Sequence, residues 1–173
     1  MRPNRNHFIL VAALLVSTFS SLAQKPKTPV EMNDYLASVT DSLYTFGTEW
    51  GRQVSASRQS MNFTLLAVPR LKMQHFIDMK GKEITGMKDI GGSEKLRAAM
   101  LEFLAYERRT ITTSFLPFEK FDSTTTQAAI DKAIAGLQSL ADSENAALKK
   151  VSVAQEEYAK KNGFTIEAEK KED

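Results

Sequence analysis

The sequence predicts an all-α fold, an antiparallel four-helix bundle with long first and last helices, and three observations predict it. Apolar residues recur at alternating steps of three and four residues over most of the chain after residue 28. No stretch combines two-residue alternation with flanking turn dipeptides, so we expect no sheet. Most connections are short, as in bundles whose helices bury their apolar stripes together. We treat residues 24–173 as one domain.

The first 23 residues predict a cleaved signal peptide. Arg2 and Arg5 precede the apolar run 8–16, and the small residues Ser21 and Ala23 follow it. The run is shorter than the roughly 18 residues of a spanning helix. We therefore expect export, either to the periplasm or to the cell surface in association with the outer membrane. No cysteine follows the cleavage site, so we expect no lipid anchor.

Composition excludes several classes of function. The chain has 23 basic and 21 acidic residues. The predicted signal peptide holds two of the basic residues and no acidic one, so the mature chain has 23 − 2 = 21 basic residues and 21 acidic residues. A neutral mature chain lacks the basic surface that nucleic-acid binding requires. The absence of cysteine excludes disulfides, thiolate metal sites and cysteine nucleophiles.

The first helix is predicted over residues 29–57, from a Thr28 cap, Pro29 at the first helical position, and Glu31 able to reach back to the cap. Gly47 and Gly51 lie one turn apart, a spacing that indicates tight packing against another backbone. The positions expected to face inward are Met32, Leu36, Val39, Leu43, Phe46, Trp50 and Val54.

The second helix is predicted over residues 59–80, and Pro69 is expected either to kink it or to break it. A glycine-rich loop is predicted to follow at 81–92. Its apolar residues are Met61, Leu65, Val68, Leu71, Phe76 and Met79.

The third helix is predicted from Ser93 to 119, with Pro117 kinking or breaking its end. Its inward positions are Leu96, Met100, Phe103, Leu104, Ile111, Phe115 and Phe118.

The turn at 89–93 resembles a phosphate-binding loop, but its glycines precede the serine and lysine without a strand before them. We interpret it as a helix start capped by Ser93.

The fourth helix is predicted as one continuous helix from the turn 122–126 to Lys161, with Gly163 as its left-handed cap. Helices 1 and 4 are expected to extend as a paired stalk, through which the chain could form a homo-oligomer. Residues 164–173 are expected to be a frayed tail.

His75 is the only histidine of the mature chain, which excludes a di-iron carboxylate site by ligand count. A copper(I) site from Met73, His75 and Met79 has suitable ligands. However, Met73 and His75 point about 200° apart on a helix.

Glu107 and Glu144 both fall on inward positions, where a carboxylate pair could act as acid and base, fix the register, or tilt out toward Arg97 or Arg108. With His75 they are the candidates for an enzyme, although the sequence shows no cleft or triad for them.

Aromatic residues are the remaining candidates for a binding surface, because such side chains anchor partner helices and peptides. Burial in the core is the alternative for each of them. These residues are Trp50, Tyr35, Tyr44, Tyr106 and Tyr158.

Three stretches, GGSEKLRAAMLEFLAYE, SFLPFEKF and AQEEYAKKNGFTI, resemble an uncharacterised family of secreted or surface-associated bacterial helical-bundle proteins, of the spirochaete and Bacteroides-lineage type. The resemblance covers the C-terminal half. It implies export and a helical bundle, and it brings no known activity. We expect no cofactor.

The sequence thus predicts an exported, non-enzymatic bundle that binds a protein, a peptide or an envelope component. Two alternatives stay open. The first is a periplasmic carrier of a small apolar ligand or copper, and the second is an enzyme that uses Glu107, Glu144 or His75.

Overall fold

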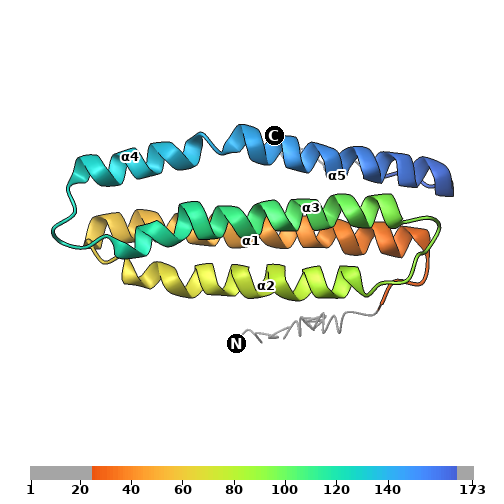
Figure 1. The fold of residues 1–173 in the computed structure, drawn as a ribbon, viewed down its shortest axis with the longest axis horizontal. Coiled ribbons are helices and arrows are strands. Elements are labelled where there is room, and N and C mark those ends of the chain that lie inside the picture. Colours follow the sequence, from red (N-terminus) through yellow and green to blue (C-terminus); the bar gives the residue numbers. More distant parts are fainter. Residues whose placement is uncertain (1–24, 167–173) are drawn as a thin grey trace, which may run out of the picture.

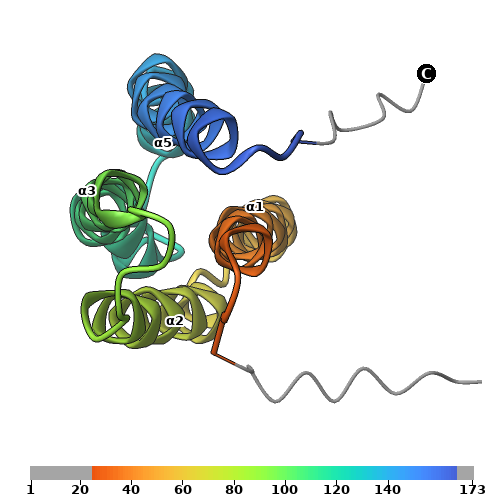
Figure 2. The same ribbon diagram turned by 90° about the vertical axis from the view of Figure 1, so that its right-hand side faces the viewer.

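The computed structural model describes residues 25–166, in which four helical rods pack together with no strand (Figure 1). The rods alternate in direction: α1 (Pro29–Ser60), α2 (Ala67–Thr85), α3 (Glu94–Thr110), and a fourth formed by α4 (Gln127–Gln138) and α5 (Ala141–Asn162). Seen end-on, α3 lies between α2 and α5 (Figure 2). The all-α bundle is therefore confirmed. The predicted signal peptide lies outside the described residues. Within residues 25–166 no helix combines the length and the hydropathy that a membrane span requires.

Helix α1 begins as predicted. The Thr28 hydroxyl accepts the Glu31 N–H at 3.2 Å, and Pro29 opens the first turn. The Glu31 carboxylate accepts the backbone N–H of Lys27 at 2.7 Å instead of returning to Thr28. Six of the seven predicted inward residues are buried, and Phe46 is half-buried.

The predicted second helix is wrong at both ends. The chain leaves α1 through Met61, whose φ of 54° is left-handed, and passes through a 3-10 turn at Thr64–Leu66 before α2 begins. Pro69 therefore lies in the first turn of α2, where its missing N–H costs little and no kink or break follows. The helix then continues through Gly81 to Thr85, so the loop is shorter than predicted.

The core face of α2 differs from the apolar positions that mark the helix in the sequence. The true inward stripe includes the charged residue Arg70, which masks the periodicity. The buried positions of this segment are Leu66, Arg70, Met73, Ile77 and Ile84. Four of the six residues that predicted the helix are exposed instead: Leu65, Val68, Leu71 and Met79.

The third rod changes its winding near Pro117. Helix α3 ends at Thr110, and a π-helical turn at Ile111–Phe115 leads into a 3-10 turn at Leu116–Lys120. Proline lacks an N–H and its ring clashes with the carbonyl four residues earlier, so the wider turn relieves that clash. The proline thus ends the regular helix earlier than predicted.

The fourth rod is broken, which corrects the prediction of one continuous helix. The Ser139 hydroxyl bonds back to the Gly136 carbonyl at 2.7 Å, and the Leu140 N–H turns to the Leu137 carbonyl at 3.0 Å. A glycine and a back-bonding serine close together weaken a helix at that point. The break separates α4 from α5 and lets α4 take its own direction.

Helices α1 and α5 do not project as a stalk, because the loop 86–93 packs over their ends. The Tyr158 hydroxyl donates to the Ile90 carbonyl at 2.7 Å, and Asn162 donates to the Gly91 carbonyl at 3.2 Å.

Helix α3 starts after Ser93 as predicted, but the Ser93 side chain does not cap it in the predicted way. Asp89 accepts both the Ser93 N–H, at 2.6 Å, and the Ser93 hydroxyl, at 3.0 Å, so that hydroxyl caps no helix amide.

Replacing Gly91 with alanine is expected to lower the free energy of unfolding by about 2 kcal/mol, because its φ is +61° and the added Cβ would meet Pro29 Cγ at 3.0 Å as well as the Asn162 side chain. Gly136→Ala is the control. Its Cβ meets nothing within 4 Å, so a gain of about 0.5–1 kcal/mol is expected. Urea unfolding of both variants measures the difference, and equal effects would contradict the packing described for this loop.

Candidate functional site: a groove between α1 and α4

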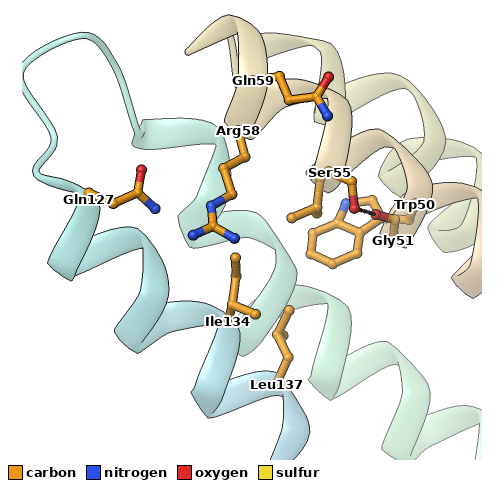
Figure 3. Close-up of a pocket in the computed structure, with 9 residues that line it drawn as sticks. Trp50, Gly51, Ser55, Arg58, Gln59, Gln127, Ile134 and Leu137 are labelled. Carbon is orange, nitrogen blue, oxygen red and sulfur yellow. Dashed lines mark hydrogen bonds between the residues drawn. The ribbon is translucent and has the colours of Figure 1, made fainter.

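A groove of about 630 Å³ lies between the second half of α1 and helix α4 (Figure 3). Trp50, Val54, Ile134 and Leu137 supply apolar surface, with the first two on α1 and the others on α4. Polar residues complete the lining: Ser55, Arg58, Gln59 and Gln127. The groove therefore joins apolar surface to polar groups that can orient a ligand, the combination found in ligand pockets.

Among the described residues, no other helix packs closely against α1 at Gly47 and Gly51. A Cβ added at Gly47 or Gly51 would meet no atom within 4 Å, and the same holds for Gly136 on α4. The prediction that the two glycines of α1 mark tight packing is therefore wrong. Because they carry no side chain, they leave room beside Trp50 rather than filling it.

Trp50 is held rigidly by aromatic neighbours. Its indole stacks on Phe115 with ring centroids 3.9 Å apart and planes 7° apart, and it meets the edge of Phe118 at 5.5 Å. Only 2% of the residue is exposed, and its indole nitrogen has no hydrogen-bond partner among the described residues. An unpaired buried donor is energetically costly, so the position of Trp50 is maintained by its aromatic packing and not by a hydrogen bond.

One ion pair crosses the groove. The Arg58 guanidinium of α1 donates to the Asp131 carboxylate of α4 at 2.6 Å, and both side chains are about half exposed, at 46% and 50%. Such an exposed pair adds at most about 1 kcal/mol. It can therefore open at little cost, which suits a rim that admits a ligand.

The other predicted aromatic anchors do not share a surface with Trp50. Tyr44 is 79% exposed on α1, and Tyr158 is buried against the loop 86–93. Tyr35 donates to Glu83 at 2.5 Å, and burial together with that carboxylate raises its pKa strongly. Tyr106 reaches the Leu140 carbonyl at 3.4 Å, next to the break between α4 and α5.

The predicted carboxylates lie near each other on α3 and α5, but in different surroundings. Glu107 is only 8% exposed and one of its carboxylate oxygens has no hydrogen-bond partner within residues 25–166, whereas Glu144 is exposed. Burial, and then the charge of Glu144, raise the pKa of Glu107 to about 7. Neither predicted arginine reaches it, because Arg108 donates to Asp78 and Arg97 to the Met87 carbonyl.

The copper ligands considered from the sequence do not converge. Met73 is buried in the core, whereas His75 and Met79 are exposed on the outer side of α2. Within residues 25–166 no group of three histidine, aspartate or glutamate side chains is placed to hold a metal ion. His75 also lies on α2, whereas Glu107 lies on α3 and Glu144 on α5.

The fold and the site together define a helical bundle with an apolar groove on one side. Comparisons with protein families, with curated proteins and with solved structures find no match for the chain. The apolar rhythm of the sequence predicts Trp50, Ile134 and Leu137 as inward residues, but it does not predict that they meet across a groove. The sequence signal for the groove is the combination of Gly136 and Ser139, which interrupts the fourth helix and lets α4 take a different direction from α5.

Proposed function

We propose that the protein is an exported, non-enzymatic binding protein that takes an amphipathic helical peptide segment, from another protein or an envelope component, into the groove between α1 and α4. The observation that carries the proposal is the groove itself. Trp50, which its aromatic neighbours hold rigidly, lines it together with Gly51, and Gly47 lies one turn away along the same helix.

A helix is the occupant that this geometry favours. Gly47 and Gly51 lie one turn apart on α1, a spacing that lets a second helix backbone approach closely. Apolar anchors at i, i+3, i+4 and i+7 of a bound helix would meet Trp50, Val54, Ile134 and Leu137. Arg58, Gln59 and Gln127 would then meet its polar flank.

The test uses a displayed library of amphipathic helical peptides, selected on the wild-type protein and counter-selected on Gly51→Leu. The leucine fills the groove, and nothing within 4 Å of Cβ opposes it. We expect peptides that bind the wild type at least tenfold more tightly and change the fluorescence of Trp50, which is the only tryptophan of the chain. Gly81→Leu is the matched control, since Gly81 is also helical with open space around Cβ but lies on α2.

Two outcomes would contradict the proposal. One is a selection that yields no peptide preferring the wild type to Gly51→Leu. The other is that Gly81→Leu weakens binding as much as Gly51→Leu does, because the effect would then not belong to the groove.

A second candidate is a carrier of a small apolar ligand, favoured by the groove volume of about 630 Å³. Small-molecule pockets measure about 300–1,000 Å³. Native mass spectrometry of the protein purified from its own host distinguishes the two candidates. A carrier would retain one small apolar molecule that Gly51→Leu loses, whereas a peptide-binding protein would retain none.

A further inference from the structure

The outward side of α2 carries exposed apolar side chains together with two lysines and a histidine, and the acidic residues Asp78 and Glu83 lie at its edges. Val68 is 72% exposed, Leu71 52% and Met79 38%. Lys72, His75 and Lys82 are also exposed and fall on the same side of the helix, opposite the buried residues Met73 and Ile77. Leu65, 50% exposed, lies just before the helix in the 3-10 turn.

The acidic groups nearest to this face are already engaged by other cations. Asp78, at its edge, accepts from Arg108 of α3 at 2.9 Å. Glu83 accepts from Lys80 at 2.8 Å and from the Tyr35 hydroxyl, and Glu49 of α1 pairs with Arg52 at 2.8 Å. Within residues 25–166 no ion pair holds Lys72 or Lys82. The Lys72 ammonium group leans toward α1, where it lies 5.1 Å from the centroid of the Phe46 ring and, after Arg52, helps to lower the pKa of Glu49. The face therefore presents positive charge.

A second copy of the chain is a poor occupant for this face. Self-association through α2 would bring Lys72 and Lys82 of both copies together, while the neighbouring carboxylates are held elsewhere. Burying like charges without counter-charges is unfavourable. An anionic lipid surface satisfies both features at once, because headgroups attract the lysines while apolar side chains enter the acyl boundary.

We propose that the outward face of α2, defined by Val68, Leu71, Lys72, His75, Met79 and Lys82, binds the protein to an anionic lipid surface. Helix α2 lies on the far side of the bundle from α4 and α5 (Figures 1 and 2). A protein bound to a membrane through the outward face of α2 would therefore keep α4, one wall of the groove, away from the lipid. This inference is independent of what the groove binds.

The test is cosedimentation of the chain from residue 24 onward with vesicles of phosphatidylcholine, with and without phosphatidylglycerol. The bundle described above lies within this chain, and the apolar run 8–16 is removed so that it cannot contribute. We expect binding only to the anionic vesicles, weakened by added salt. The double variant Val68→Glu with Leu71→Glu is expected to lose at least tenfold in partitioning, and Lys72→Gln with Lys82→Gln to weaken both the binding and its salt dependence.

The matched control is Tyr44→Glu with Val153→Glu, which adds the same charge at exposed apolar residues of α1 and α5. This variant is expected to bind vesicles at least half as well as the wild type, and circular dichroism checks that every variant is folded. The proposal is overturned if the wild type binds no anionic vesicle, or if the control loses as much as the α2 variant. It is also overturned if the α2 variant only converts a dimer to a monomer in analytical ultracentrifugation, because the face would then be a contact between copies.

Discussion

Replacing Glu119 with alanine is expected to lower the free energy of unfolding by about 3–5 kcal/mol. Arg70 of α2 donates to both carboxylate oxygens of Glu119 in the 3-10 turn after α3, with the second contact at 3.3 Å. The two side chains are only 10% and 16% exposed. The substitution would leave the Arg70 guanidinium buried with the Gln74 side chain, 3.0 Å away, as its remaining partner.

Urea unfolding followed by circular dichroism measures this loss. Glu102→Ala is the control, since Glu102 pairs with Lys150 in a bridge that is 62% and 60% exposed, and an exposed pair contributes at most about 1 kcal/mol. Changing both buried partners, Arg70→Met with Glu119→Leu, is expected to restore most of the stability. Similar losses for Glu119→Ala and Glu102→Ala would contradict the burial of the pair.

Replacing Glu107 with glutamine is expected to change how stability depends on pH. The pKa of Glu107 is raised to about 7 in the folded protein by burial and then by Glu144, from an ordinary value of 4.5. Between these values the unfolded chain loses the proton while the folded chain keeps it. The free energy of unfolding therefore falls as the pH rises through this window, by a total of about 3 kcal/mol.

The Glu107→Gln variant lacks this titration, so its stability is expected to vary less between pH 4.5 and pH 7 and to exceed that of the wild type at pH 8. Glu144→Gln is the informative second variant. Removing that charge takes away the smaller cause of the shift, so most of the wild-type dependence should remain. Parallel pH profiles for the wild type and Glu107→Gln would show that Glu107 is not buried as an isolated carboxyl.

The sequence predicts the bundle well where the apolar stripe is unbroken. In α1 and α3 the three-and-four spacing identifies nearly all of the buried residues, because one face supplies them and local signals mark each start. It fails in α2, where Arg70 replaces an apolar residue at a core position and apolar side chains appear on the exposed side. Periodicity cannot distinguish the two faces of such a helix, since only the partner Glu119 makes Arg70 acceptable in the core.

The site could be predicted only in part. The inward position of Trp50 follows from the periodicity of α1, but its partners depend on where the fourth helix breaks. That break results from a serine hydroxyl that bonds to a glycine carbonyl, a weak local preference that the apolar rhythm of residues 130–158 conceals. The glycines of α1 show the same limitation, because their spacing fits either close packing or an open groove, and only the position of α4 decides between them.

The free energy of unfolding of Gly51→Leu, measured in urea without any ligand, tests most directly whether the groove between α1 and α4 is open. Leucine is a better helix former than glycine by about 0.8–1 kcal/mol, so an open groove predicts a variant at least as stable as the wild type. If the helices close over this position, overpacking would cost about 1–3 kcal/mol. A loss in that range would contradict the groove and the function proposed for it.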